Sequence, residues 1–162
     1  MFCQVIAVSP SVNAISDSQK KSITTNCQQI KSNLRTLQKN DARIRVYLGS
    51  YYETILTKFI TPLNVRLVEN NLSNADFVEN QNKFAEAKNL FANDYIKYQQ
   101  YLEELVAIDC KSEPDKFYEK LESVRRRRQT MAQDALKLRT LISDHLKLVN
   151  NLKGKLWKTN SQ

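Results

Sequence analysis

The chain has 162 residues, with 25 Lys and Arg against 17 Asp and Glu, so its formal net charge is +8 at pH 7. Only 2 Gly and 3 Pro are present, which leaves little turn chemistry for an all-β or α/β fold and favours long helices. The hydrophobic fraction of 41% suffices for a core, but the sequence contains no run of about 18 apolar residues that could span a membrane.

Residues 1–15 form an apolar segment that differs in composition from the rest of the chain. A short apolar run from Phe2 to Val8 precedes Pro10, and Ala14 offers a small residue where a secretory signal would be cleaved. The segment is typical of the back half of a signal peptide that lacks its basic region; the alternative is a loosely packed N-terminal tail. We therefore expect a secreted, periplasmic or cell-surface protein, with a cytoplasmic one as the alternative.

Residues 16–71 are expected to form one long helix. Its apolar side chains alternate at spacings of four and three, which is the seam of a coiled coil, and they are Ile23, Cys27, Ile30, Leu34, Leu37, Ile44, Leu48, Tyr51 and Ile55. Bends are expected at Gly49-Ser50 and at Thr61-Pro62, because proline removes an amide donor and its ring clashes one turn back. A break near Asn40-Asp41 would instead produce a four-helix bundle; we favour one helix because the heptad phase passes through without a slip.

Two further helices are expected over residues 74–110 and 114–157. Ser73 with Asp76 is typical of a capping pair at a helix start, and Pro114 suits a first turn. The stripe of the second helix consists of Phe77, Phe84, Phe91, Tyr95, Tyr98, Leu102 and Leu105. The seam of the third consists of Phe117, Leu121, Val124, Met131, Ala135, Leu138, Ile142, Val149, Leu152 and Leu156. Residues 16–162 are thus predicted to be a single all-α domain, an elongated antiparallel three-helix coiled-coil bundle.

Four consecutive arginines, Arg125 to Arg128, raise the question of a nucleic-acid or membrane patch. Successive helical residues point about 100° apart, so the four guanidinium groups cannot share one face. Arg125, Arg126 and Arg127 are expected on the outer and flanking positions, where they are candidates for contact with an acidic partner. Arg128 falls on the seam, where a guanidinium needs a partner or has to extend to water. We predict that Asp41, also on a seam, pairs with Arg128; extension of Arg128 to water is the alternative.

The charge is distributed unevenly among the three predicted helices. Residues 16–71 hold 9 basic against 4 acidic side chains, residues 73–115 hold 4 against 9, and residues 120–158 hold 11 against 3. The net charges of the first two segments cancel, so the excess of positive charge belongs to the third helix. This helix also bears Trp157 among lysines. This layout predicts, as an alternative function, a basic bundle whose third helix binds an anionic polymer such as nucleic acid, or a membrane surface.

With turns near positions 72 and 112, the first helix is longer than its neighbours. Residues 16–33 would then project about 27 Å beyond the bundle at about 1.5 Å per residue, and their seam would lack a partner. The resulting candidates for self-association, or for docking to a helical protein through residues 18–37, are Ile23, Cys27, Ile30 and Leu34. Cys27 is expected in an intermolecular disulfide; the competing outcome is a fold-back of the first helix that joins Cys27 to Cys110 within one chain.

The sequence lacks the usual signatures of catalysis and metal binding. His145 is the only histidine and falls on a seam position, without Cys or carboxylate neighbours at ligand spacing. There is no Gly-rich phosphate loop, no Cys-x-x-Cys and no serine elbow. We therefore expect no cofactor, no metal and no small-molecule substrate. The predicted function is a non-enzymatic coiled-coil module with a structural or protein–protein interaction role.

Overall fold

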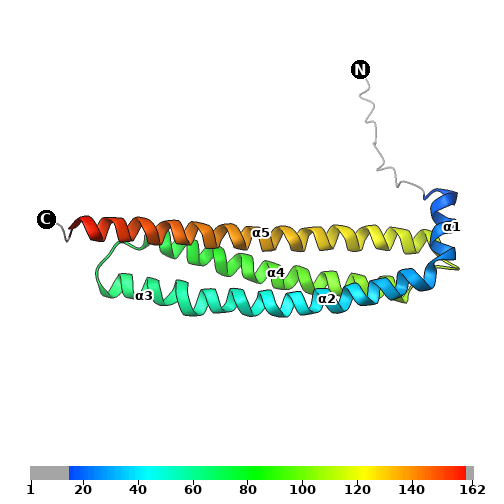
Figure 1. Cartoon of the computed structure of the whole chain (residues 1–162), viewed down its shortest axis with the longest axis horizontal. Coiled ribbons are helices and arrows are strands. Elements are labelled where there is room, and N and C mark those ends of the chain that lie inside the picture. Colours follow the sequence, from blue (N-terminus) through cyan, green and yellow to red (C-terminus); the bar gives the residue numbers. More distant parts are fainter. Residues whose placement is uncertain (1–14, 160–162) are drawn as a thin grey trace, which may run out of the picture.

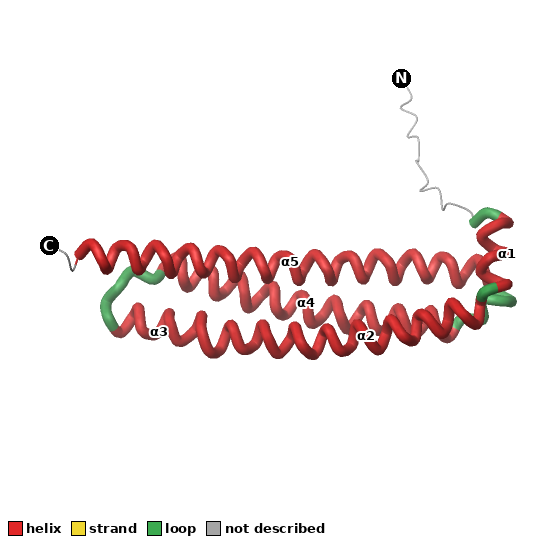
Figure 2. Tube along the Cα trace, viewed as in Figure 1, coloured by secondary structure: helices red, strands yellow, loops and turns green. Residues whose placement is uncertain are grey.

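The computed structural model describes residues 15–159. Its elements are α1 (Asp17–Thr25), α2 (Cys27–Thr54), the π-helical η1 (Ile55–Ile60), α3 (Thr61–Glu69), α4 (Ala75–Ala107) and α5 (Pro114–Thr159). All are helices, and no strand occurs in this part of the chain (Figure 2), which confirms the all-α prediction. The signal-peptide prediction concerns residues 1–14, which lie outside the described residues.

The helices pack lengthwise into an elongated bundle (Figure 1). α2, η1 and α3 continue one another along one side, and α5 lies along the other side. α4 runs between them in the opposite direction and packs on both. α2 and α5 therefore run parallel and are held together mainly through α4. α2 continues through Asn40 and Asp41 without interruption, so the break considered there does not occur.

The core is built on the stripe of α4 that the periodicity predicts. All seven residues of that stripe are buried, namely Phe77, Phe84, Phe91, Tyr95, Tyr98, Leu102 and Leu105. Phe84 and Phe91 meet the Tyr52 ring of α2 edge to face. Tyr98 belongs to one apolar cluster with Phe117 of α5. Because full burial of each large apolar side chain contributes about 1.5–3 kcal/mol, α4 is the central element that stabilises the other two sides.

Pro62, at one of the two expected bends, alters the helix locally without ending it. The chain forms the π turn η1 directly before it, and the Thr61 N–H bonds to the Leu56 carbonyl five residues back. A wider turn leaves room for the pyrrolidine ring, which has no N–H to donate and would clash with the preceding turn of an α-helix. The helix also continues through Gly49 and Ser50, so the residues of the second expected bend do not interrupt it.

The turn between α3 and α4 is closed by backbone hydrogen bonds. Asn71 adopts a left-handed conformation with φ 54°, and the Leu72 N–H donates to the Leu67 carbonyl at 2.9 Å. This is a Schellman ending, which satisfies carbonyls that the last helical turn leaves unpaired. α4 then begins without a side-chain cap, so the capping expected of Ser73 with Asp76 does not form.

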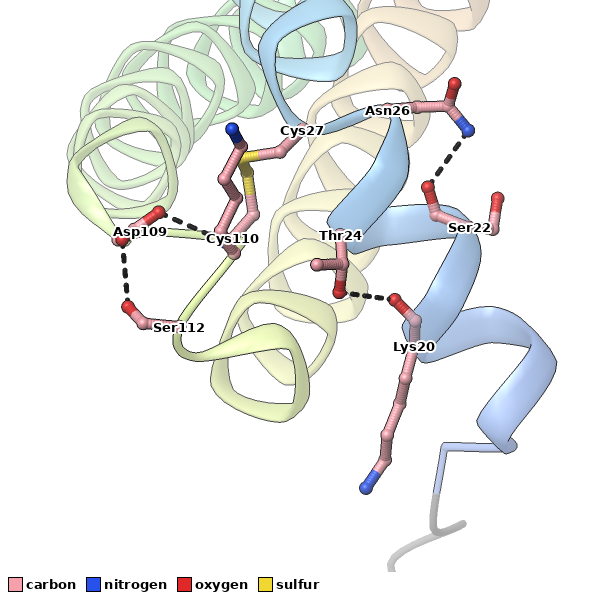
Figure 3. Close-up of a disulfide and its surroundings, with 9 residues drawn as sticks. Lys20, Ser22, Thr24, Asn26, Cys27, Asp109, Cys110 and Ser112 are labelled. Atoms are coloured by element: carbon pink, nitrogen blue, oxygen red, sulfur yellow. Dashed lines mark hydrogen bonds between the residues drawn. A yellow bond between two sulfur atoms is a disulfide. The ribbon is translucent and has the colours of Figure 1, made fainter.

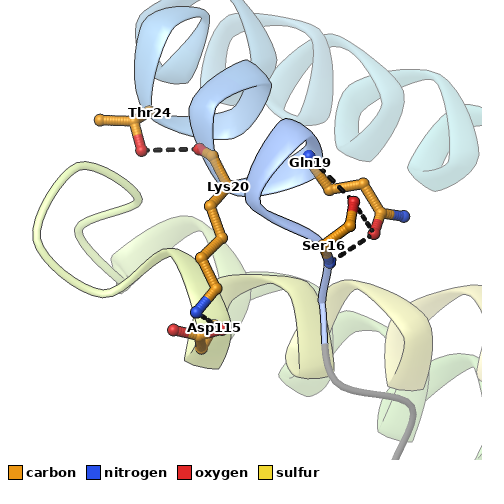
Figure 4. Close-up of polar contacts among 5 residues, drawn as sticks. All are labelled: Ser16, Gln19, Lys20, Thr24 and Asp115. Atoms are coloured by element: carbon orange, nitrogen blue, oxygen red, sulfur yellow. Dashed lines mark hydrogen bonds and ion pairs between the residues drawn. The ribbon is translucent and has the colours of Figure 1, made fainter.

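The first predicted helix is broken at Asn26 and does not continue as one rod. The Asn26 side-chain Nδ2 donates to the Ser22 carbonyl at 3.0 Å, a local bond that competes with a continued helix. α1 lies across the end of the bundle (Figure 1), where Lys20 Nζ is 2.9 Å from Asp115 Oδ1 at the start of α5 (Figure 4). Ser16 caps the first turn of α1. The first helix therefore turns over the bundle end and does not project from it.

A disulfide joins Cys27 to Cys110 (Figure 3), with 5.6 Å between their Cα atoms. The predicted overhang of residues 16–33 is therefore wrong, and the structure contains the competing fold-back. The overhang prediction assumed that the second helix reaches Cys110, but α4 ends at Ala107 and Ile108 is extended (φ −64°, ψ 134°). The chain from Ile108 to Cys110 is therefore not helical, and it brings Cys110 to the level of Cys27.

The residues predicted to dock through that overhang belong to the core. Ile23, Cys27 and Leu34 are buried, and Ile30 is half-buried against the same apolar cluster. These side chains already pack against α4 and the start of α5, so they offer no free seam. Docking through the seam of Ile23, Cys27, Ile30 and Leu34, or an intermolecular disulfide at Cys27, is therefore not compatible with the structure.

Loss of the disulfide is expected to destabilise the fold. The bond spans a sequence separation of 83 residues, and removing a native disulfide costs about 2–4 kcal/mol. The variant Cys27→Ser/Cys110→Ser should therefore unfold at a lower denaturant concentration than the oxidised wild type, as followed by circular dichroism. Reduced wild type should match the variant, and the variant should not respond to reductant. Equal midpoints for oxidised and reduced wild type would show that the bond is absent.

Candidate functional site

The four arginines of α5 do not share one face, as their helical phase predicts. Arg125 pairs with Glu122 one turn back on its own helix, and Arg126 is exposed. Arg127 lies over the Tyr101 ring of α4, 4.9 Å from its centroid. The four guanidinium groups of the run therefore do not converge on one face of α5.

Arg128, the last of the run, reaches across to Asp41 of α2. Its Nε donates to Asp41 Oδ2 at 2.9 Å, and its Nη2 donates to Oδ1 at 3.2 Å. Tyr98 of α4 donates its hydroxyl to the same Oδ2 at 2.6 Å. The Asp41 side chain is 4% exposed and that of Arg128 is 50% exposed. The structure thus brings together the two residues expected to pair and adds Tyr98, which periodicity assigned to the core alone.

These hydrogen bonds stabilise a charge inside the bundle. A buried carboxylate without partners would cost several kcal/mol, whereas Asp41 accepts three hydrogen bonds. Burial raises the pKa of Tyr98, and its hydrogen bond to Asp41 raises it further, so the hydroxyl stays protonated and donates. The hydrogen bond to Asp41 raises the pKa of Arg128, so that side chain stays charged. The result is one fixed polar centre shared by α2, α4 and α5.

Next to this centre, α2 and α5 leave an open groove with α4 at its base. A first hollow of about 430 Å³ lies between α2 residues 41–48 and α5 residues 125–135, with Phe91 of α4 at its base. A second hollow continues along α5 to Leu146 and shares Leu48 and two alanines with the first. The groove therefore runs for about 30 Å along α5, at about 1.5 Å per residue.

The walls of the groove carry apolar side chains that remain exposed to solvent. On α2, Ile44 is 52% and Tyr51 is 45% exposed; on α5, Leu136 is 60% and Leu146 is 57% exposed. Ala132 and Ala135 on α5 also line the groove and add little bulk. Contiguous apolar surface with a polar rim marks interaction sites, in contrast to single exposed apolar residues. The groove is therefore the candidate functional site.

Both walls repeat at the spacing of a coiled-coil seam. On α2 the lining positions include Asp41, Ile44, Leu48 and Tyr51, and on α5 they include Ala132, Leu136, Arg139, Ser143 and Leu146. The heptad phase assigned Ile44 and Tyr51 to the core of the bundle, which is wrong. The structure buries Tyr52 and turns Ile44 and Tyr51 to the groove. The four-three spacing is therefore present on α2, but Ile44 and Tyr51 remain exposed beside the groove.

The remaining sequence candidates lie away from the groove. Trp157 is 73% exposed near the end of α5, about 45 Å along the helix from Arg127. The four candidates from the first helix lie in the core near the disulfide. The described part of the chain has no helix with the length and apolar character needed to cross a bilayer.

His145 is a buried structural residue. Its Nδ1 lies 3.1 Å from Asn80 Oδ1, and the Asn80 amide nitrogen donates to the Leu141 carbonyl at 3.1 Å. The Asn80 oxygen is thus an acceptor, so the His145 Nδ1–H is the donor. The His145 ring also meets the Phe77 ring edge to face. Among residues 15–159, no group of three His, Cys, Asp or Glu side chains is arranged to hold a metal ion.

The fold is expected to lose stability as His145 becomes protonated. Burial lowers the pKa of His145 below its ordinary value of about 6.5, so the unfolded chain binds this proton more tightly than the folded chain. The contribution is complete above about pH 6.5 and is lost as the pH falls from there through the lowered pKa. His145→Gln, which can still donate to Asn80, should remove this part of the pH dependence of denaturant unfolding. Parallel stability profiles for variant and wild type would argue against it.

Arg128 and Asp41 are expected to be energetically coupled. Arg128→Leu leaves the buried carboxylate with Tyr98 alone and should cost about 2 kcal/mol, less than a fully buried pair because the Arg128 side chain is 50% exposed. Adding Asp41→Leu should restore part of the loss, which a double-mutant cycle measures as an interaction energy. Arg126→Leu, the control, should change stability by less than about 0.5 kcal/mol. Purely additive losses would mean that the two residues do not interact.

Comparison with known proteins does not place the chain in a family. No protein-family model matches it. No curated protein sequence and no solved structure matches it either. The polar centre at Asp41 and the groove beside it are therefore the features from which a function can be inferred.

Proposed function

We propose that this chain is a non-enzymatic protein–protein interaction module that binds a helix of a partner protein in the groove between α2 and α5. The observation that supports this function is the exposed seam, with Ile44 and Tyr51 on one wall and Leu136 and Leu146 on the other. Its residues repeat as they do where one helix packs against another. In the described part of the chain, no helix lies opposite this seam.

A docked helix would complete a four-helix arrangement, with α4 diagonally opposite to it. Hydrophobic grooves recognise amphipathic helices through apolar anchors spaced at i, i+3, i+4 and i+7. Covering the exposed leucines and the half-buried Leu48 would remove apolar surface from water, which stabilises a complex by about 25 cal/mol for each Å². Ala132 and Ala135 carry little bulk on the α5 wall, so the backbone of a bound helix can approach α5 closely.

The proposal also specifies the architecture of the bundle and the compartment in which the protein acts. We take the bundle to be an elongated antiparallel three-helix coiled coil of α2–η1–α3, α4 and α5, because their buried residues follow a four-three spacing over much of their length. The Cys27–Cys110 disulfide supports an oxidising compartment. An exported protein, active as a binding or structural module outside the cytoplasm, is consistent with that bond.

The alternative proposal, in which α5 binds an anionic polymer or a membrane surface, has weaker support. The excess of positive charge on residues 120–158 favours it. However, Arg125 is paired on its own helix and Arg127 is stacked on Tyr101, so the cations do not form one surface. Binding to a polyanion that weakens steeply between about 50 and about 200 mM salt would favour this alternative.

A neutral amphipathic peptide tests the groove. A helix of about 20 residues, with a Leu and Ala stripe at coiled-coil spacing and Gln on its flanks, spans about 30 Å. Added to isotope-labelled protein, it should produce saturable shifts of backbone amide resonances. These shifts should be largest in α2 residues 41–52 and α5 residues 125–146, because these segments form the walls.

A pair of variants controls for a general loss of binding. Leu136→Glu should weaken peptide binding by at least about tenfold, because the bound helix would bury the new carboxylate against an apolar stripe. Leu90→Glu makes the same change at an exposed residue of α4 that does not line the groove, and it should leave binding unchanged. Equal losses in the two variants, or no saturable binding to the wild type, would refute the proposed function.

A further inference from the structure

We infer that the helix accepted by the groove carries carboxylates on its flanks, so that the partner is an acidic amphipathic helix. The inference rests on the proposed function and adds the chemistry of the partner. It follows from the charges that line the groove, from the burial and pairing of the Asp41 carboxylate, and from the positions of the arginines on the two walls.

The residues that line the groove are strongly biased toward positive charge. Four of them are arginines, Arg45 on α2 and Arg125, Arg128 and Arg139 on α5. Asp41 is the only acidic residue that lines either hollow. Within residues 15–159, ion pairs engage Arg125 and Arg128, whereas Arg45 and Arg139 have no carboxylate partner. The groove therefore has an uncompensated positive charge on each wall.

Asp41 does not offset this charge for an incoming ligand. It is 4% exposed, and both of its oxygens accept hydrogen bonds, from Arg128 and Tyr98. The guanidinium of Arg128 has five N–H groups, and only two of its nitrogens bond to Asp41. Because the Arg128 side chain is 50% exposed, it can also donate to a ligand in the groove. A partner carboxylate would meet donors here, and no exposed acid.

Arginines from both walls flank the end of the groove nearest Asp41. The Arg45 guanidinium lies over the Tyr95 ring, 5.3 Å from its centroid, and this cation–π contact favours one position of the side chain. Arg45 shares the first hollow with Arg125 and Arg128 of the opposite wall. Guanidinium groups bind carboxylates through paired, charge-assisted hydrogen bonds. This end of the groove is therefore the place for one partner carboxylate.

Arg139 provides a second anchor at a defined distance along α5. Eleven positions separate it from Arg128, which corresponds to about three helical turns or about 16 Å. A partner helix that lies along α5 would match both arginines with two carboxylates about 11 residues apart. Between them, apolar residues of the partner would face Ala132 and Leu136. Along the side that faces α5, the expected partner helix therefore carries an acidic residue, then apolar residues, then a second acidic residue.

Other occupants fit this surface less well. A second copy docking through the same groove would oppose its own four arginines to these four, and juxtaposed like charges are unfavourable. A basic helix would meet the same repulsion. The experiments below distinguish both of these occupants from an acidic helix.

Three peptides with one shared Leu and Ala stripe test the inference. Each has about 20 residues, enough to span about 30 Å as a helix, and carries Glu, Gln or Lys on its flanks, including two positions about 11 residues apart. In fluorescence anisotropy at about 50 mM salt, the Glu peptide should bind at least about tenfold more tightly than the Gln peptide, and the Lys peptide most weakly. The difference should shrink at about 500 mM salt, where exposed charges are screened.

Charge reversal inside and outside the groove provides the matched control. Arg45→Glu/Arg139→Glu should invert the preference, so that the Lys peptide binds most tightly. Arg66→Glu/Arg126→Glu changes the net charge equally at two exposed positions that do not line the groove, and it should preserve the preference for Glu. A Glu preference that survives reversal inside the groove would locate the acid-binding surface elsewhere and overturn the inference.

The remaining outcomes separate the inference from the proposed function. Equal affinities for the three peptides would overturn the acidic partner and leave the groove as a helix-binding site. Binding of none of them would overturn both. A dimer seen by light scattering, and abolished by Leu136→Glu but retained in Leu90→Glu, would replace the partner helix with a second copy of this chain.

Discussion

The buried carboxylate of Asp41 is the constraint on which the arrangement of the helices depends. A charge inside the bundle is strongly unfavourable unless donors surround it, and Asp41 receives them from Tyr98 on α4 and Arg128 on α5. Sliding any helix by one turn, about 5.4 Å, would remove at least one of these donors. Apolar seams alone tolerate such slips better, because successive heptads are alike. This polar centre therefore fixes the relative register of α2, α4 and α5.

The same centre helps to explain why the groove is open. Arg128 reaches Asp41 with a long side chain, which connects α5 to α2 without bringing their backbones together. Farther along, Tyr52 Oη lies 3.5 Å from the Ala135 carbonyl, a long distance for a hydrogen bond. Phe91 of α4 fills the base between the two walls, and the small side chain of Ala135 cannot close the space above it. α2 and α5 are thus linked but not packed along this stretch.

Helical periodicity predicts which residues share a stripe, but not which stripe meets a neighbour. The α4 stripe, the divergence of the arginines and the approach of Arg128 to Asp41 could be predicted, because they follow from helix phase and turn positions. Ile44 and Tyr51 could not be placed in this way. Tyr52 lies only about 100° farther around α2 than Tyr51, and the number of helices around α2 decides which side is buried. That number depends on the whole fold, and so does the groove.

The structure at the two ends of the bundle depends on contacts between residues that are distant in the sequence, so helical periodicity does not predict it. The same contacts hold the walls of the groove in place. The heptad pattern continues through Asn26, yet the helix breaks there, and the Cys27–Cys110 disulfide ties that point to the α4–α5 turn. At the other end, Asn80 links α4 to α5 through His145. With both ends joined, the walls are already positioned before a ligand arrives. A bound helix would therefore cost less ordering of the protein, and its selection would depend on the apolar and arginine side chains of the walls.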